Sequence, residues 1–352
     1  MKIRNITFQH YKKFIRKKDF SFCKTNGEVN GLTLIVGDNG TGKSSLLQAI
    51  VAMIAPLTRD RFKASDIDWS GFEYRFLQTG KMPLQMNATV EFGNEEIDET
   101  ISLAKKLTEK GIKLGIPGNN KEVVLTFDYE TEKTKTKHAR NYYQFSGYQY
   151  AKKLTTYEPD KSKLFENVGN IYWYTEQRSS NSINNPFDKE ELQINSIRTF
   201  LASAYNFHLA IEQKKIKLQP GQFDYYSHLA RLYQTVFPDR KFSGSVPRFD
   251  LLEKSEAPDF FLHDDKNEYE LSEMSAGERA IFPILMDFAR YNINNSIIII
   301  DEIELHLHAP LQQAFVRALP KLGKNNQFIL TSHSDSVAVM FDENENQIIR
   351  LK

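Results

Sequence analysis

A glycine-rich stretch at residues 37–44, GDNGTGKS, has the residue types and spacing that bind phosphate. It fits the pattern G-x-x-x-x-G-K-[ST] at every position. Glycines let backbone N–H groups converge on phosphate oxygens, and the positive end of a following helix attracts the same anion. Lys43 is expected to contact the β- and γ-phosphates and to support catalysis, and Ser44 to ligand Mg²⁺. The residues predicted to bind the nucleotide here are Asn39, Gly40, Gly42, Lys43, Ser44 and Ser45.

Two carboxylates follow directly on the four isoleucines of residues 297–300. Such a run of β-branched residues favours a central strand covered on both faces. Sheets of α/β proteins bind ligands beyond the C-terminal ends of their strands, which is where Asp301 and Glu302 fall. We expect Asp301 to belong to the Mg²⁺ shell and Glu302 to polarise the attacking water. The alternative is a strand that simply leaves the core through two acidic residues.

Two further polar segments accompany this strand. Residues 271–279, LSEMSAGER, precede it, and Ser275 and Glu278 satisfy the S-x-x-E capping box that begins a helix. Residues 331–334, TSHS, follow the apolar run at 328–330. Taken alone, the first segment is a well-capped helix and the second is a loop with a structural histidine, His333.

The order of these four segments along the chain resembles that of ABC-type ATPases, in the variant found in SMC, RecF and OLD-like proteins. In that family two copies dimerise head to tail, and the signature segment of one copy closes over the γ-phosphate held by the other. The resemblance implies that Ser275 and Gly277 act on the nucleotide of the partner copy. It also implies that His333 contacts the γ-phosphate or the attacking water, and that ATP and Mg²⁺ are the cofactors.

Residues 304–310, ELHLHAP, resemble the E-x-H-L-H-P stretch of OLD and RecF-like ATPases, which corresponds to a region that faces the dimer partner. Ala309 departs from that pattern because it stands between His308 and the proline. A His-x-His pair such as His306 and His308 can also ligand zinc, so metal binding is an open alternative.

An aromatic strand that ends in polar residues, 171–178 with the sequence IYWYTEQR, is the candidate for the segment that completes the Mg²⁺ and water shell. Gln177 is the predicted ligand of both the metal and the nucleotide, and Arg178 is its rival. No motif surrounds these residues, so a plain exit from strand to loop is an equal alternative.

These segments need a scaffold of alternating strands and helices, which the last third of the chain provides. Expected helices at 276–291 and 309–319 alternate with strands. Earlier in the chain, an expected helix at 44–54, closed by Pro56, also follows a strand. This alternation indicates an α/β fold with a parallel sheet. With the resemblance, it predicts an ABC-type P-loop ATPase head that has a mixed β-sheet core and an inserted, mainly helical lobe. No heptad repeat is sustained, so no long coiled coil is expected.

Three parts are expected along the chain. Residues 1–80 hold the phosphate loop of the ATPase head, and 81–258 form a β-strand arm and the helical lobe. Residues 259–352 complete the head with the signature segment at 271–279, the acidic strand and His333, which corresponds to the family's switch histidine. The chain ends shortly after His333, so the resemblance predicts an ATPase core without a C-terminal nuclease segment of its own.

Composition limits the classes of protein that fit. The chain has 352 residues, 46 Lys and Arg against 45 Asp and Glu, and a single cysteine. This balance excludes a histone-like basic binder, and one cysteine excludes an intrachain disulfide and a cysteine-rich zinc site. No apolar run approaches the roughly 18 residues of a membrane span, and the N-terminus lacks the apolar core of a signal peptide. We therefore expect a cytoplasmic protein with no membrane partner.

Basic residues interleave with aromatic ones at 133–153, and a second basic cluster consists of Lys12, Lys13, Arg16, Lys17 and Lys18. Both clusters make DNA a candidate partner, although a solvated surface explains them equally well. Stand-alone proteins that resemble this core include PtuA-like ATPases, which are paired with a nuclease in bacterial anti-phage systems. We therefore expect an ATPase that dimerises head to tail around ATP and gates a separately encoded nuclease or other effector, in anti-phage defence or DNA metabolism.

Two other functions fit the sequence less well. The ATPase subunit of a membrane transporter is disfavoured because Lys43 and Ser275 lie about 230 residues apart, whereas such subunits keep the two motifs close. A scaffold that binds ATP without hydrolysing it is disfavoured because Glu302 is retained.

Overall fold

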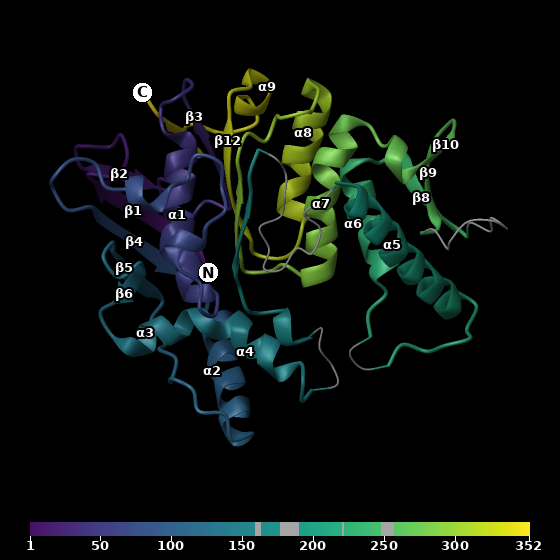
Figure 1. Ribbon diagram of the computed structural model, residues 1–352, viewed down its shortest axis with the longest axis horizontal. Coiled ribbons are helices and arrows are strands. Elements are labelled where there is room, and N and C mark those ends of the chain that lie inside the picture. The colour runs from purple at the N-terminus through teal and green to yellow at the C-terminus, as the bar shows by residue number, and fades with distance from the viewer. Residues whose placement is uncertain (159–162, 177–189, 220–221, 248–256) are drawn as a thin grey trace.

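In the described residues, two five-stranded sheets and one three-stranded sheet form the frame of the molecule (Figure 1). The computed structural model describes residues 1–158, 163–176, 190–219, 222–247 and 257–352. Helix α1 (Lys43–Thr58) packs between the two larger sheets, in one hydrophobic core that takes side chains from both. This arrangement places the phosphate loop, which precedes α1, at the edge of the core.

All five strands of the central sheet run parallel, in the order β13-β3-β12-β11-β7. In that order, their bounds are Ile348–Arg350, Leu32–Val36, Gln327–Ser332, Ile297–Ile300 and Ile171–Tyr174. Every residue of β11 and β12 is buried, as a parallel sheet covered on both faces requires. Alternate isoleucines of β11 enter different cores: Ile297 and Ile299 pack on the side of α1, and Ile298 and Ile300 on the opposite side.

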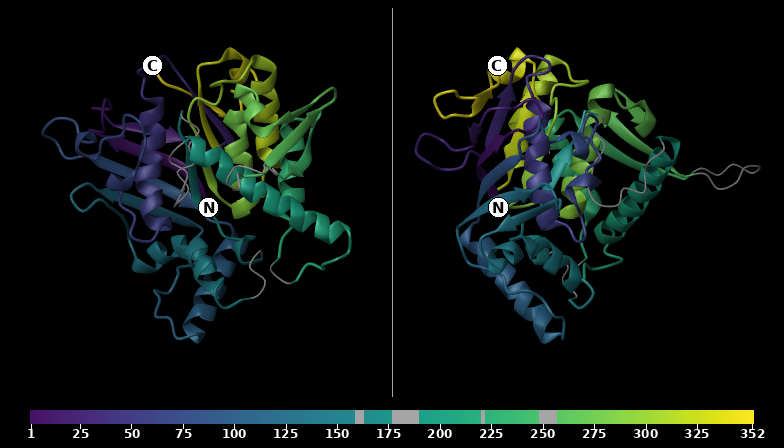
Figure 2. Two further views of the ribbon diagram at one scale, coloured as in Figure 1. Left: turned by 45° about the vertical axis from the view of Figure 1, so that its right-hand side comes forward. Right: turned by 60° about the vertical axis from the view of Figure 1, so that its left-hand side comes forward.

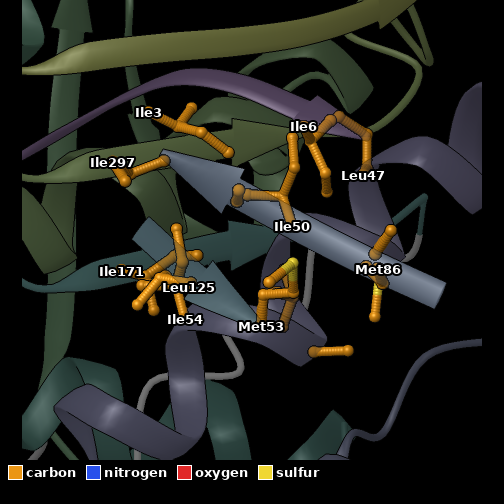
Figure 3. Close-up of a cluster of buried hydrophobic side chains, with 14 of the residues drawn as sticks. Ile3, Ile6, Leu47, Ile50, Met53, Ile54, Met86, Leu125, Ile171 and Ile297 are labelled. Carbon is orange, nitrogen blue, oxygen red and sulfur yellow. The ribbon is translucent and has the colours of Figure 1, made fainter. Parts of the chain in front are cut away.

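The second large sheet is antiparallel, in the order β2-β1-β4-β5-β6. In that order, its strands are Lys18–Ser21, Lys2–Gln9, Gln85–Glu91, Glu122–Asp128 and Lys133–Thr136. Figure 3 shows side chains of α1 packed against this sheet and against the parallel sheet; the labelled ones are Leu47, Ile50, Met53 and Ile54 of α1, Ile3, Ile6, Met86 and Leu125 of the antiparallel sheet, and Ile171 and Ile297 of the parallel sheet. Because α1 is buried on nearly every side, its sequence is apolar all round.

Helices α7 (Ala276–Tyr291) and α8 (Ala309–Ala318) lie on the other face of the parallel sheet and share a second core with it. Helix α6 (Tyr225–Val236) packs on α7, and α5 (Glu190–Glu212) packs on α6. The small antiparallel sheet β10-β9-β8 (Glu268–Glu270, Asp259–Asp264, Arg240–Val246) lies beside these helices. We call α5, α6 and β8–β10 the lateral lobe; the right view of Figure 2 shows it at one side of the molecule.

A third, smaller core joins helices α2 (Asn94–Glu109) and α4 (Gly147–Leu154), next to the short helix α3 (Ala139–Tyr143). These helices lie at the end of the molecule away from the C-terminus in both views of Figure 2. Helix α9 (Asp335–Ala338) follows β12 at the opposite end (Figure 1). None of the helices in the described ranges combines the length and apolarity that crossing a bilayer requires.

Most expected elements are confirmed in place. Helix 276–291 has the expected bounds, and the expected helix 309–319 ends one residue earlier. The prediction that Pro56 closes the first helix is wrong, because α1 continues to Thr58. The turn that contains Pro56 is buried, so packing between two sheets outweighs the backbone hydrogen bond that a proline removes. Strands β4–β6 share one sheet with β1, and the division at residues 80 and 258 stays a prediction.

Candidate nucleotide-binding site

Three of the four predicted segments begin where strands of the parallel sheet end. The phosphate loop follows β3, Asp301 follows β11, and His333 follows β12. Strand β12 lies between β3 and β11 and runs parallel to both, so these segments meet at one edge of the sheet. The fold thus gathers residues that are nearly 300 positions apart in the sequence.

The phosphate loop has a backbone that its glycines make possible. Gly40 and Gly42 have φ angles of 75° and 100°, in the left-handed region that glycine adopts without strain. A Cβ at Gly42 would lie 2.7 Å from Cζ of Phe14, so this position has no room for a side chain. Gly42 is also the N-cap of α1, and glycine has no side chain that could cap the helix. The first N–H groups of α1 are therefore open to an anion.

Lys43 connects the phosphate loop to the histidine segment. Its Nζ donates to the carbonyl oxygens of Gly37 at 2.9 Å and Asp38 at 3.3 Å, and lies 2.6 Å from Nε2 of His333. An ammonium group only donates, so this ring nitrogen is the acceptor. Burial lowers the pKa of Lys43, although the Asp301 carboxylate nearby opposes this shift.

Asp301 is the most deeply buried acid at this edge, at 2% exposure. Its carboxylate accepts hydrogen bonds from the hydroxyls of Thr331 and Ser44, and its backbone N–H donates to the carbonyl oxygen of Tyr174 at 2.9 Å. Burial raises the pKa of Asp301, and the two hydroxyl groups oppose that rise.

Glu302 has an unusual backbone, with a φ angle of 49° that few residues other than glycine adopt. Its N–H donates to Oγ1 of Thr331 at 2.7 Å, so one hydroxyl bridges Asp301 and Glu302. Burial, together with repulsion from Asp301 and Glu304, raises the pKa of Glu302. A carboxylate whose pKa is raised is a stronger base toward a water molecule. Strained backbone of this kind clusters at functional sites.

The histidine segment is held by a second carboxylate. Oε1 of Glu304 accepts the backbone N–H of His333 at 2.6 Å, which fixes the loop that presents the imidazole to Lys43. His308 serves helix α8 instead, because its Nδ1 accepts the N–H of Leu311 at 3.4 Å as an N-cap. In the part of the chain that the structure describes, no group of three His, Cys, Asp or Glu side chains gathers to hold a metal. The zinc alternative at the histidine pair therefore gains no support.

The pair of residues predicted to hold Mg²⁺ fits that ion. The Ser44 hydroxyl and the Asp301 carboxylate are within hydrogen-bonding contact although they come from different motifs. Mg²⁺ prefers oxygen ligands, and proteins usually hold it with one or two carboxylates together with phosphate oxygens of the substrate. A hydroxyl and a carboxylate beside a phosphate loop provide this donor set.

Of the lysines that the sequence placed in a nucleic-acid cluster, Lys13 lies against the phosphate loop and Lys12 against helix α1 and Gly71. Nζ of Lys13 donates to the carbonyl oxygen of Gly40. Nζ of Lys12 donates to Oε1 of Gln48 at 2.5 Å and to the carbonyl oxygen of Gly71 at 3.1 Å. Burial lowers the pKa of Lys12 to about 8. The sequence shows two adjacent lysines between two expected strands. It does not show that the turn carrying them folds against the phosphate loop.

The signature segment lies apart from this group. Among the described residues, the hydrogen bonds of Ser275 go to Glu278 and Arg279, and none goes to the phosphate loop. Ser275 caps α7, so the predicted capping box is confirmed. Gly277 is buried, and a Cβ there would lie 2.6 Å from Cδ2 of Leu311. Close packing of α7 against α8 is therefore a second reason for this glycine.

The strand expected before the water-shell residue is confirmed as β7, which pairs with β11 in the register Ile300 with Tyr174. Gln177 and its rival Arg178 lie outside the described residues. Glu176, which no sequence motif marks, lies near enough to Asp301 to raise the pKa of Asp301. The end of β7 thus adds a carboxylate to the same edge of the sheet.

Comparison with known proteins gives a consistent family. Residues 32–339 match the family described as "AAA domain, putative AbiEii toxin, Type IV TA system". "Retron Ec83 probable ATPase" of Escherichia coli is 27% identical over 401 aligned positions, which cover 97% of this chain and 70% of that protein. "Retron Vc95 probable ATPase" of Vibrio cholerae serotype O1 biovar El Tor is 24% identical over 392 positions, covering 99% and 73%.

A solved structure of an SMC head bound to the C-terminal winged-helix domain of ScpA has a similar fold. Its TM-score is 0.50 at 14% sequence identity, and the match covers 99% of this chain and 94% of that one. The expected family, fold class and enzyme class are confirmed by these matches. The chain belongs to the AAA-domain family described above and is an SMC- and OLD-like, ABC-type P-loop ATPase with an SMC head-like α/β fold.

Proposed function

We propose that two copies of this ATPase sandwich two ATP molecules head to tail, and that the ATP-bound dimer gates a separately encoded effector. The observation that carries the proposal is the single site at the sheet edge, where Nζ of Lys43 lies 2.6 Å from His333 and Asp301 contacts Ser44. All four motifs of the resemblance are present in the chain, but among the described residues the hydrogen bonds of Ser275 go to Glu278 and Arg279, and none goes to this site. A second copy supplies it.

The chemistry assigned to each residue follows from its position. Lys43 and the N–H groups of α1 hold the β- and γ-phosphates. Ser44 and Asp301 hold Mg²⁺, which neutralises charge on the phosphate oxygens when it is bound. Glu302 accepts a proton from the attacking water, and its raised pKa suits that role. Once ATP separates His333 from Lys43, the tautomer with its proton on Nε2 donates a hydrogen bond to the γ-phosphate.

The lid over the γ-phosphate is assigned to Ser275 and the N-terminus of α7 in the partner copy. Ser275 and Ala276 are exposed, so the end of this helix is accessible to a second molecule. A helix N-terminus carries partial positive charge that stabilises phosphate. Gly277 has no side chain, so α7 can pack closely against α8, and this packing sets the direction in which the N-terminus of α7 points. Gln177 is retained as the proposed ligand that completes the metal and water shell.

A positioning role for Thr331 gives a testable prediction. Thr331→Val is expected to lower the ATPase rate about tenfold while ATP affinity stays within about twofold, because the lost hydroxyl leaves Asp301 and Glu302 less firmly placed and small misplacements are costly. Steady-state phosphate release and calorimetric titration with a non-hydrolysable ATP analogue measure the two quantities. Thr331→Ser retains the hydroxyl and is the matched control. Equal rates in the two variants would contradict the role.

The relatives support an effector partner and a role in defence. Two curated relatives that span nearly all of this chain are named as retron ATPases. We propose on this basis that the chain works with a nuclease or another effector in anti-phage defence, and that ATP-dependent dimerisation is the signal that the effector reads. Isolation of the tagged chain from its native host, with the mass of the intact complex, identifies that partner.

We propose that DNA binds to this protein and stimulates its ATP hydrolysis. Within the basic cluster, Lys13 contacts the phosphate loop and Lys12 contacts Gln48 of α1, whereas Arg16, Lys17 and Lys18 are exposed on the same turn and the strand that follows it. A cation next to the ATP site can couple phosphate binding on DNA to ATP turnover. Contacts of this kind weaken with salt because each one releases counterions.

Double-stranded DNA is expected to stimulate ATP hydrolysis at low salt and to lose this effect at high salt. In the triple variant Arg16→Ala, Lys17→Ala and Lys18→Ala, the slope of log affinity against log salt should fall by about 0.9 for each lost phosphate contact. The matched control removes three exposed lysines elsewhere, Lys214, Lys215 and Lys217. Stimulation that is identical in both triple variants would rule out this cluster as the DNA contact.

A further inference from the structure

A buried carboxylate lies directly behind the exposed start of α7. Glu278, three residues after Ser275, is 1% exposed and accepts hydrogen bonds from five donor groups. Its Oε2 accepts the backbone N–H of Ser275 at 2.8 Å and the Ser275 hydroxyl at 2.7 Å. Glu278 therefore fixes both the backbone and the hydroxyl of the residue proposed to reach the γ-phosphate.

The other three donors to Glu278 come from the lateral lobe. The hydroxyls of Tyr233 on α6 and Tyr269 on β10 each donate to Oε1 at 2.5 Å. Arg240 on β8 forms an ion pair with Oε2. Burial by itself raises the pKa of Glu278, but these hydrogen bonds outweigh burial and lower the pKa to about 2. The carboxylate is thus ionised. Among the contacts of the described residues, Arg240 of the lobe is the only positively charged side chain that pairs with it.

A second ion pair holds the other end of the signature segment. Arg198 on α5 donates from Nε and Nη2 to the two oxygens of Glu270, at 2.9 and 2.6 Å. Glu270 in turn accepts the N–H of Ser272 at 2.8 Å and the N–H of Phe260 at 3.4 Å. Residues 270–278 are therefore held at both ends by carboxylates that each pair with an arginine of the lateral lobe.

Ion pairs of this kind specify geometry more than they add stability. Removing two charges from water costs nearly as much as their attraction returns, whereas the directions of the hydrogen bonds restrict the arrangement of the groups. A bidentate arginine adds further directional restriction. If the lateral lobe shifts relative to α7, Glu278 loses three of its five donors, and Ser275 loses the group that orients it.

We propose that Arg240 and Arg198 are positioning residues for ATP hydrolysis, through which the place of the lateral lobe controls whether Ser275 can complete the site of the partner copy. The inference rests on the proposed head-to-tail dimer. It adds a regulatory input: a partner that binds and moves the lateral lobe changes dimer formation and turnover without contacting ATP.

The test uses the 352-residue chain with Glu302→Gln, which accumulates the ATP-bound dimer under the proposed function. Adding Arg240→Ala is expected to raise the dissociation constant of that dimer at least tenfold in sedimentation experiments with ATP and Mg²⁺. In the chain with Glu302 intact, Arg240→Ala lowers kcat at least tenfold. The affinity of the protomer for ATP is measured at protein concentrations well below the dissociation constant of the dimer. It stays within twofold of the value without Arg240→Ala. Arg198→Ala has the same pattern, and Arg240→Lys recovers part of the effect because it retains the charge.

The controls separate positioning from general damage to the fold. Arg231→Ala removes an exposed arginine of α6 that contacts His228 and not the signature segment, and it should change none of these values more than twofold. Tyr269→Phe removes one hydroxyl donor and serves if Arg240→Ala does not fold. If the dimer is as tight with Arg240→Ala or Tyr269→Phe as without them, the positioning role is overturned and the head-to-tail dimer is not. A Glu302→Gln protein that remains monomeric overturns the head-to-tail site on which the inference rests.

Discussion

Glu302→Gln is expected to lower the steady-state rate of ATP hydrolysis by a factor of about 10² to 10⁴, the range typical of a lost general base. An amide has nearly the same shape as a carboxylate but cannot take a proton from water. ATP binding should stay intact, because the groups proposed to hold the phosphates and the metal are unchanged. The ATP-bound dimer should therefore persist for much longer than in the unsubstituted protein.

The measurements are phosphate release over time and the mass of the protein in solution with ATP and Mg²⁺. The matched control is Glu343→Gln, which changes an exposed glutamate paired with Arg350 and should leave the rate unchanged. If Glu302→Gln retains more than about half of the rate, the attacking water is activated by another group, and Glu176 at the end of β7 is the next carboxylate to test.

Lys43→Ala is expected to weaken ATP binding at least 100-fold. The ammonium group lies where the phosphate loop, His333 and the Asp301 carboxylate converge, and charge-assisted hydrogen bonds are each worth roughly 1.5–3 kcal/mol. Two such bonds to phosphate correspond to about two orders of magnitude in affinity or more. Calorimetry with ATP and Mg²⁺ measures the loss directly.

Lys321→Ala is the control for Lys43→Ala, since it removes an exposed lysine that follows α8. Both variants should unfold at similar temperatures without nucleotide, because Lys43 bonds only to backbone carbonyls of its own loop and to His333 in the described structure. With ATP present, only the control should be stabilised, as mass action requires of a ligand that binds the native state. Equal stabilisation of both variants would contradict the role of Lys43.

The parts of the site that the sequence predicted are those encoded in consecutive residues. The phosphate loop depends on glycines at fixed spacing, and Asp301 follows four isoleucines that only a buried strand accommodates. The cap at Ser275 depends on a partner three residues away. Each of these patterns is local, so a single segment carries the whole signal.

The parts that the sequence missed depend on contacts between distant segments. Thr331 bridges Asp301 and Glu302 across two parallel strands, and its position in a short TSHS segment gave no sign of this. Lys13 reaches the phosphate loop because a turn folds back over Gly42, and the same lysine read in isolation suggested a DNA surface. The pairing of Arg240 with Glu278 joins a strand of the lateral lobe to the signature helix. Spacing alone contains none of these contacts.

The composite site is tested most directly by a structure of the Glu302→Gln protein with ATP and Mg²⁺. We expect two copies related by a two-fold axis, with the Ser275 hydroxyl of each copy hydrogen-bonded to the γ-phosphate on the Lys43 loop of the other. A structure in which ATP is bound at that loop in a monomer, or in a dimer with Ser275 turned away from both nucleotides, would contradict the account.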